Sequence, residues 1–187
     1  MRKISDIGVL IFGIILFIIS YQFDAEINLL FSSAKFQVFD IIFSSITNFG
    51  VVIIAMAVIP SIVLYKKNRK AVYLLWTSLS ISLVLSLAIK LMFLRQRPID
   101  PFTFPFTTIV NYSFPSMHAM AVLSLLPILA KYLNRQKSFW IGFGLFAVFS
   151  RIYLGFHYLS DVIFGALAGY LIGNLLLKLH EEKKLWK

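Results

Sequence analysis

The chain has 187 residues, of which 59% are hydrophobic, and its mean hydropathy of +0.85 is too high for an ordinary soluble domain. Its formal net charge of +10 would suggest a nucleic-acid partner in a soluble protein. In so apolar a chain, however, that charge is typical of the basic cytoplasmic loops of a membrane protein, so we expect no nucleic acid as a partner. There is no cysteine, which excludes disulfides and thiolate metal sites.

Six apolar stretches predict an all-α integral membrane protein, a six-transmembrane helix bundle that forms a single domain over residues 1–187. Each stretch can hold a helix of about 16–24 residues, close to the roughly 20 needed to cross a bilayer. A basic start precedes the first stretch, as in a signal peptide, but no small-residue cleavage site follows, so we interpret it as an uncleaved span. The stretches are residues 7–22, 43–65, 71–94, 116–132, 138–155 and 159–178.

Most of the 18 basic residues lie in four groups: before the first span, between spans 2 and 3, between spans 4 and 5, and after span 6. With six crossings all four groups face one side, which the positive-inside rule identifies as the cytoplasm. The sequence therefore predicts cytoplasmic N and C termini. Residues 23–42, which carry four charged side chains, fall on the opposite side, and we expect them to lie along the interface as an amphipathic segment.

Polar residues interrupt the apolar pattern in three stretches on the predicted outer side, which faces the periplasm or the cell exterior. These stretches are Lys90–Pro98, Ser113–Met120 and Ser150–Val162. Ionisable residues near membrane depth are costly and tend to mark function. The stretches therefore predict a functional site at the extracytoplasmic interface, although we interpret Arg95 and Asp100 as solvated loop residues.

Several of these polar residues also have a purely structural interpretation when each is taken alone. Ser116 follows a proline and could cap the helix of span 4. His118 could be a core histidine with a satisfied hydrogen bond. His157 and Asp161 are four residues apart, so they could form a stabilising contact on one helix face.

Taken together, the polar residues supply what phosphoryl transfer requires. Lys90 and Arg97 alone could be helix-end residues that extend to the interface. With Arg151 they can instead clamp a phosphate that carries about two negative charges. Ser116 and the backbone N–H groups at the start of span 4, including that of Met117, add donors at a positive helix end.

The histidines and the aspartate complete this interpretation. A neutral His157 can attack phosphorus, and Asp161 can accept the other ring N–H and stabilise the imidazolium that develops. His118 can protonate the leaving oxygen. The sequence contains no cluster of metal ligands, and we expect neither a metal nor another cofactor.

Three ordered motifs resemble the signature of the type 2 phosphatidic acid phosphatase (PAP2) superfamily, which includes soluble acid phosphatases and vanadium haloperoxidases. They read K-x6-RP from Lys90, PS-x-H from Pro115 and SR-x5-H-x3-D from Ser150. The resemblance implies six helices, a site at the outer interface and metal-independent chemistry through a phosphohistidine. The roles that it implies are phosphate binding by Lys90, Arg97, Ser116, Met117 and Arg151, with His118 as the acid, His157 as the nucleophile and Asp161 as its partner.

One position departs from that signature, because Met117 stands where the family usually has glycine in Pro-Ser-Gly-His. The change leaves the chemistry intact and the substrate open among polyprenyl pyrophosphates such as undecaprenyl pyrophosphate, phosphatidylglycerol phosphate and phosphatidic acid. We expect a membrane lipid phosphatase, with Pro98–Phe114 as a lid or tail guide. The alternatives are a lipid phosphotransferase with an alcohol acceptor and, less favoured, a transporter of phosphate lipids. The sequence leaves the oligomeric state open.

Overall fold

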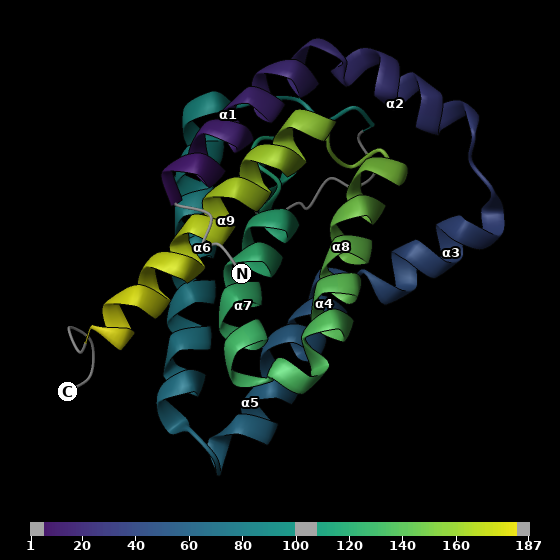
Figure 1. Cartoon of the computed structure of the whole chain (residues 1–187). Helices are drawn as coiled ribbons and strands as arrows, with labels where there is room; N and C mark the ends of the chain where they lie inside the picture. The colour runs from purple at the N-terminus through teal and green to yellow at the C-terminus, as the bar shows by residue number, and fades with distance from the viewer. Residues whose placement is uncertain (1–5, 100–107, 183–187) are drawn as a thin grey trace.

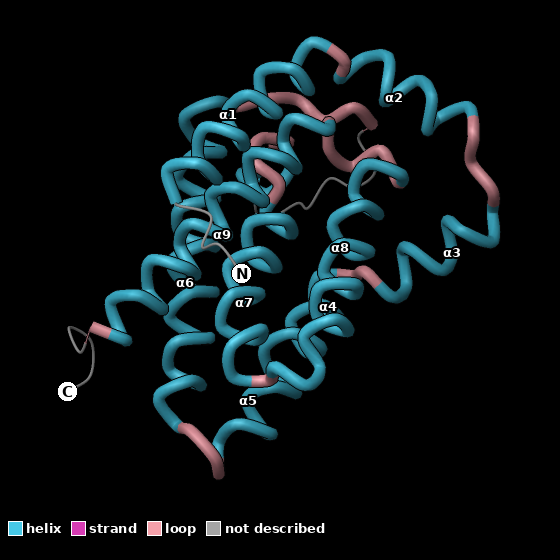
Figure 2. The backbone as a smooth tube through the Cα atoms, viewed as in Figure 1, coloured by secondary structure: helices cyan, strands magenta, loops and turns pink. Residues whose placement is uncertain are grey.

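Helices make up the elements of the computed structural model, which describes residues 6–99 and 108–182, and no strand occurs among these residues (Figures 1 and 2). Residues 100–107 of the expected lid loop Pro98–Phe114, Asp100 among them, lie outside the described residues. The helices are α1 (Asp6–Gln22), α2 (Asp24–Ser33), α3 (Gln37–Ile46), α4 (Phe49–Ile53), η1 (Ile54–Val58), α5 (Ile59–Tyr65), α6 (Arg69–Phe93), η2 (Thr108–Asn111), α7 (Met117–Tyr132), η3 (Asn134–Gln136), α8 (Lys137–Tyr153) and α9 (Leu159–Glu181).

Among the residues that the structure describes, two single helices, α6 and α9, have the length and apolar character to cross a membrane. Three pairs of helices meet these criteria only as joined units, with bends of 66° between α1 and α2, 51° between α3 and the α4–α5 segment, and 120° between α7 and α8. The all-helical prediction is therefore confirmed, and six crossings remain a prediction. The expected span 43–65 is wrong at its start, because α3 ends at Ile46 and Asn48 begins a new helix by accepting a hydrogen bond from Gly50 N at 3.0 Å.

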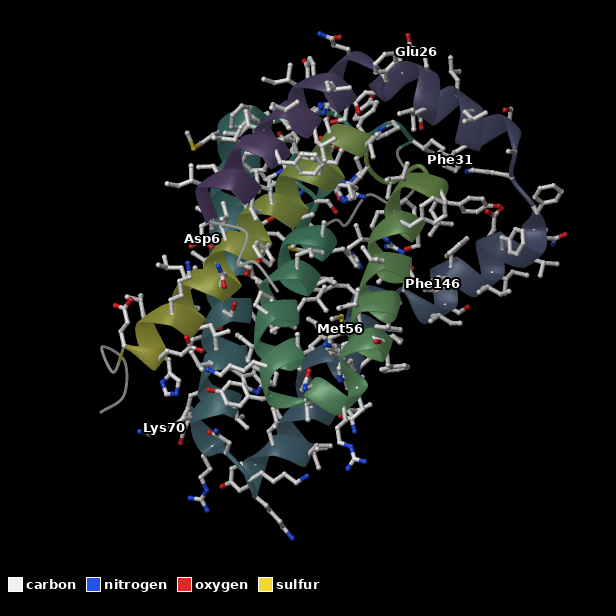
Figure 3. The ribbon with its side chains drawn as sticks, viewed as in Figure 1. Asp6, Glu26, Phe31, Met56, Lys70 and Phe146 are labelled. Atoms are coloured by element: carbon white, nitrogen blue, oxygen red, sulfur yellow. The ribbon has the colours of Figure 1, made fainter. Side chains whose placement is uncertain are left out.

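Helices α2 and α3 form an arm that runs apart from the bundle and rejoins it at α4 (Figure 1). An aromatic cluster joins this arm to α8: the ring of Phe31 lies 5.6 Å from that of Phe149, and the ring of Phe43 lies 4.9 Å from that of Phe146. Figure 3 shows Phe31 and Phe146 on the side of α8 that faces the arm. The other faces of α2 and α3 expose apolar side chains such as Leu29 and Ile41.

The helix ends separate into two groups (Figure 1). The basic turns between α5 and α6 and between α7 and α8 lie at one end of the bundle. The end of α6, the start of α7 and the turn between α8 and α9, where the three polar stretches lie, are at the other. This arrangement agrees with the alternation of basic and polar stretches in the sequence.

Helix α9 packs directly on the backbone of α7 through three glycines spaced four residues apart, Gly165, Gly169 and Gly173. A Cβ at Gly165 would lie 2.6 Å from the carbonyl oxygen of Ser116. At the other two glycines a Cβ would overlap the backbone carbonyls of Met120 and Ser124, the next turns of α7. Small residues at this spacing allow membrane helices to approach closely, and here they bring the starts of α7 and α9 together.

The glycine contact makes a testable prediction. Gly169→Ala should reduce the stability of the protein in detergent by about 1–3 kcal/mol, because the added methyl meets backbone that cannot move aside easily. Thermal unfolding of the purified protein measures this change. Gly142→Ala, on an exposed part of α8 where a Cβ meets nothing within 4 Å, is the matched control. Equal melting temperatures for the two variants would contradict the close packing.

Candidate active site

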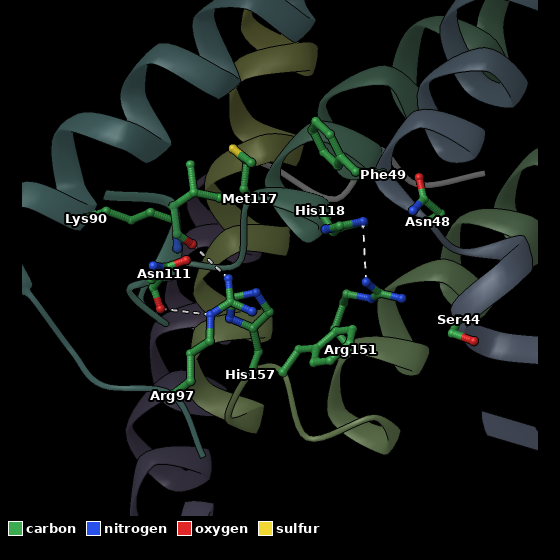
Figure 4. Close-up of a pocket in the computed structure, with 12 residues that line it drawn as sticks. Ser44, Asn48, Phe49, Lys90, Arg97, Asn111, Met117, His118, Arg151 and His157 are labelled. Carbon is green, nitrogen blue, oxygen red and sulfur yellow. Dashed lines mark hydrogen bonds between the residues drawn. The ribbon is translucent and has the colours of Figure 1, made fainter. Parts of the chain in front are cut away.

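The three polar stretches of the sequence meet around one cavity of about 590 Å³ (Figure 4). It lies at the end of the bundle opposite the basic turns. The residues that line it are Ser44, Asn48, Phe49, Lys90, Arg97, Val110, Asn111, Met117, His118, Arg151, Phe156 and His157. Six of the eight expected site residues are thus brought to one cavity, and the other two, Ser116 and Asp161, lie behind its wall.

His157 lies in the turn that joins α8 to α9, not within α9, so it does not share a helix face with Asp161 as the spacing had suggested. The turn follows Gly155, whose φ of 74° is in the left-handed region that favours glycine. The backbone N–H of His157 then donates to Arg151 O at 3.2 Å. These contacts hold the imidazole at the cavity, where only 3% of the residue is exposed.

Asp161 is fully buried in the first turn of α9, with its Oδ2 3.8 Å from His157 Nδ1. That distance is too long for a hydrogen bond. The hydroxyl of Ser113 lies between the two side chains: it donates to Asp161 Oδ2 and is 3.4 Å from His157 Nδ1. The expected pairing of His157 with Asp161 is therefore present at a distance longer than a hydrogen bond, and the hydroxyl of Ser113 bridges the two side chains.

His118 is in the first turn of α7, on the far side of the cavity from the α8–α9 turn (Figure 4). Its Nε2 lies 3.5 Å from Nη1 of Arg151, and because a guanidinium can only donate, Nε2 is the acceptor of this contact. The ring also packs edge-on against Phe49, with 4.7 Å between ring centroids. Both histidines of the polar stretches thus face the same space.

The three cations enter the cavity from different elements. Lys90, at the end of α6, is only 1% exposed, so it does not extend to the interface as a free helix-end residue would. Its ammonium donates to the backbone carbonyls of Tyr112 and Ser113. Arg97 donates from Nε to Asn111 O and from Nη2 to Val110 O, both at 2.8 Å. Two cations therefore hold the carbonyls of residues 110–113.

Arg151, the third cation, is 4% exposed and is held from the opposite side of the cavity. Its Nη2 donates to Thr47 Oγ1 and, at 3.0 Å, to Ser150 Oγ. Thr47 is itself buried in the short break between α3 and α4, and its hydroxyl donates to Phe43 O at 2.5 Å. The break that the sequence did not predict therefore supplies the hydroxyl that orients Arg151.

Ser116 occupies the capping position that its sequence context allowed. Its hydroxyl accepts from Ala119 N at 3.4 Å, and its own N–H donates to Asp161 O at 3.1 Å. Met117, the next residue, lines the cavity. The start of α7 is thus joined by a backbone hydrogen bond to the first turn of α9.

Arg95 is the residue that sequence reasoning placed wrongly. Instead of being solvated, its guanidinium forms ion pairs with Asp24 and Asp161, both at 2.7 Å. The sequence did contain one indication of this role: Asp24 and Asp161 are carboxylates near membrane depth, and such groups require partners. The residue was missed because nothing in the sequence shows that Asp24 and Asp161 meet.

Burial lowers the pKa of His157 from its usual 6.5 to about 3. The charges of Lys90 and Arg97 act in the same direction, against the nearby carboxylate of Asp161. His157 is therefore neutral at physiological pH, as a nucleophilic imidazole must be. Among residues 6–99 and 108–182, no group of three or more histidines, aspartates or glutamates lies together in a way that could hold a metal ion.

Two solved structures share this fold. A transmembrane PAP2-type phosphatidylglycerolphosphate phosphatase from Bacillus subtilis matches with a TM-score of 0.74 and 20% identity, over 100% of both chains. LpxE of Aquifex aeolicus matches with a TM-score of 0.64 and 24% identity, over 83% of this chain and 94% of that one. With its membrane-capable helices and this fold, the chain is a multi-pass membrane protein.

Sequence comparison identifies the family. Phosphatidylglycerophosphatase B of Bacillus subtilis (strain 168) is 32% identical over 88 residues, a match that covers 41% of this chain and 43% of that relative. The model of the PAP2 superfamily matches residues 70–185, which include all three polar stretches and more than half of the chain. The chain belongs to the PAP2 superfamily.

Proposed function

We propose that this protein is a membrane lipid phosphatase that hydrolyses a phosphomonoester or pyrophosphate head group through a phosphohistidine intermediate. The observation that carries the proposal is the convergence of three cations and two histidines on one cavity. Lys90 and Arg97 come from one polar stretch and Arg151 from another, and His118 and His157 lie between them (Figure 4). An anionic phosphate is the ligand that such a concentration of positive charge favours.

Phosphate binding would use donors that now contact the backbone. The ammonium of Lys90 and the guanidinium of Arg97 point into the cavity while they hold carbonyls of residues 110–113. Lys90 is buried and Arg97 is half-buried, so both are less solvated than surface cations, and a charged phosphate oxygen is a better partner for them than a neutral carbonyl. Arg151 closes the opposite side of the same space.

In the first chemical step, Nε2 of His157 attacks phosphorus, because Nδ1 is turned toward Ser113 and Asp161. A nitrogen–phosphorus bond forms and the bond to the leaving oxygen breaks. His118 gives that oxygen a proton, and the negative charge of the bound phosphate favours the protonated form of its ring. In the second step, water attacks phosphorus, gives a proton to His118 and releases phosphate from His157.

Loss of the nucleophile is the direct test of this mechanism. His157→Asn should lower the release of phosphate from lipid substrates by at least about a thousandfold, because no other group can form the covalent intermediate. His180→Asn is the matched control, since His180 lies near the far end of α9 and away from the cavity. Turnover of the His157→Asn protein within about tenfold of the wild type would rule out the histidine nucleophile.

We also propose that the reaction needs no divalent metal, because Lys90, Arg97 and Arg151 supply the charge that a metal would otherwise supply. Phosphate release by the purified protein should continue at an unchanged rate in excess chelator. Measured rates with chelator, and with magnesium added back, decide the point. Turnover that stops with chelator and returns with magnesium would contradict the proposal.

The substrate is proposed to be a lipid whose tail stays among the apolar helices. Phe49, Met117, Val110 and Phe156 give the cavity apolar walls beside its cations. The name of the Bacillus subtilis relative makes phosphatidylglycerophosphate the first substrate to assay. Polyprenyl pyrophosphates such as undecaprenyl pyrophosphate, and phosphatidic acid, complete the panel.

A lipid phosphotransferase is the second candidate, and the observation that favours it is Met117 in the wall of the cavity. An apolar side chain in this wall disfavours water and can pack against the carbon atoms of an alcohol. Analysis of the products with and without an alcohol acceptor separates the two functions. Free phosphate in both conditions supports the phosphatase.

We propose further that the cavity faces the periplasm or the cell exterior and that both termini are cytoplasmic. The basic turns lie at the opposite end of the bundle from the cavity, and the positive-inside rule places such turns in the cytoplasm (Figure 1). The whole chain is proposed to act as one domain over residues 1–187.

Cysteine labelling tests this orientation, because the chain has no native cysteine. Gln96→Cys, exposed beside the cavity, should react with an impermeant thiol reagent in intact cells. Lys67→Cys, exposed in the basic turn between α5 and α6, should react only after the membrane is opened. The reverse pattern would invert the orientation, and reaction of both in sealed cells would mean that the number of crossings is wrong.

A further inference from the structure

Arg95 is the centre of a polar network that lies behind the cavity. Its Nη1 donates to Asp161 Oδ1 at 2.7 Å and to Ser160 Oγ at 2.8 Å, while its Nη2 donates to Asp24 Oδ2 at 2.7 Å. Asp24 also accepts from Ser160, from the backbone N–H at 2.9 Å and from the hydroxyl at 2.5 Å. Both carboxylates are buried, and the side chain of Arg95 is 23% exposed.

In this network the two carboxylate oxygens of Asp161 have different hydrogen-bond partners. Oδ1 accepts from Arg95, and Oδ2 accepts from Tyr158 N at 2.9 Å and from the hydroxyl of Ser113. Charge-assisted hydrogen bonds of this kind keep the group ionised and fix its rotation. A fixed Oδ2 in turn directs the Ser113 hydrogen toward Asp161, so the Ser113 oxygen is left to accept the Nδ1–H of His157.

The contacts of Arg95 suit a guanidinium specifically. It lies 4.1 Å above the ring of Tyr158 and 5.2 Å from that of Tyr21, in addition to its two ion pairs. Burial alone would lower the pKa of Arg95, but the hydrogen bond to Asp24 and the charge of Asp161 outweigh it and raise that pKa. A lysine could replace the charge but could not donate in two directions while stacked between two rings.

We propose that Arg95 is a positioning residue for catalysis: held by Asp24, it fixes Asp161 and, through Ser113, keeps His157 in the tautomer with Nδ1–H and an unprotonated Nε2. The role rests on the proposed phosphatase function. It extends that function to a residue that does not line the cavity. A wrong tautomer places the proton on the nitrogen that must attack, which lowers the rate without weakening phosphate binding.

The competing interpretation is that Arg95 only ties together the α1–α2 bend, the loop after α6 and the start of α9. Both interpretations predict lower stability when the network is broken, so stability cannot decide between them. Two other measurements decide between them: turnover at saturating substrate and the protonation of the His157 ring. If Arg95 is only a structural tie, neither should change in protein that remains folded.

The experiment uses the full-length protein in detergent with three variants: Arg95→Gln, Arg95→Lys and the control Lys131→Gln. Lys131→Gln breaks another ion pair between helices, that of Lys131 with Glu181 at the basic end of the bundle. We expect Arg95→Gln to lower kcat about tenfold to a hundredfold with KM within about threefold of the wild type. Arg95→Lys should retain an intermediate kcat, and Lys131→Gln should change neither constant.

The second readout does not depend on activity. Nitrogen-15 NMR of histidine-labelled protein, with His157→Asn to assign the signals, reports which ring nitrogen carries the proton. The wild type should show the Nδ1–H tautomer at His157, and Arg95→Gln should show a mixture. If Arg95→Gln melts earlier but keeps both the wild-type kcat and the His157 tautomer, Arg95 is only a structural tie and the proposal is wrong.

Failure of the proposed function would look different. A wild-type protein that releases no phosphate from any lipid of the panel would overturn the phosphatase, whatever the state of the His157 ring. An unchanged tautomer in Arg95→Gln would still overturn the positioning role in that case. Should Arg95→Gln fail to fold, Arg95→Lys carries the same test, because the proposal requires that it too lower kcat and alter the tautomer.

Discussion

The close approach of α9 to α7 is the constraint on which the site depends. Three glycines at a four-residue spacing remove the side chains that would otherwise keep the two backbones apart. This contact begins at Gly165 and Ser116, one turn of α9 beyond Asp161. The backbone hydrogen bond from Ser116 N to Asp161 O then becomes possible at 3.1 Å, and His118 and His157 come to face one cavity. A side chain at Gly165 would push α9 away from α7 and so move the two histidines apart, although no catalytic residue had been replaced.

The positive charge of the site is a second constraint, because taking cations out of water costs free energy. Two buried cations, Lys90 and Arg151, and the half-buried Arg97 lie around the cavity. Carbonyls of residues 110–113 accept hydrogen bonds from Lys90 and Arg97, but neutral carbonyls neutralise no charge. A bound phosphate would supply that charge. The segment 110–113 is therefore both a partner of the cations and a competitor of the ligand.

Much of this architecture could be predicted from the sequence, because it depends on local patterns. Apolar stretches of about 20 residues predicted the helices, and three polar stretches at alternate helix ends predicted which residues share one end of the bundle. Lys90, His118 and His157 could be assigned to the site from this pattern. The repeat Gly165, Gly169 and Gly173 was not predicted to be a helix contact, although its spacing is typical of close helix packing.

What the sequence could not show depends on contacts between distant residues. Thr47 has no local feature that marks it as the partner of Arg151, 104 positions later. Ser113 likewise reads as a loop serine until Asp161 is placed beside it. The spacing of His157 and Asp161 suggested a helical pair, yet the turn at Gly155 places His157 before the helix begins. In each case tertiary contact, not local propensity, decided the outcome.

The sharp bend between α1 and α2 also depends on a contact between distant residues. A continuous helix through Phe23 would carry residue 24 onward along the axis of α1, whereas the observed bend of 66° follows burial of Asp24 against Ser160 and Arg95. A buried carboxylate needs such partners, and the start of α9 provides them. The arm formed by α2 and α3 therefore begins at a residue that is two hydrogen bonds from Asp161. It ends at the break that holds Thr47 against Arg151. Both ends of the arm contact residues that orient the catalytic groups, so the arm belongs to the framework of the site and is not a separate appendage.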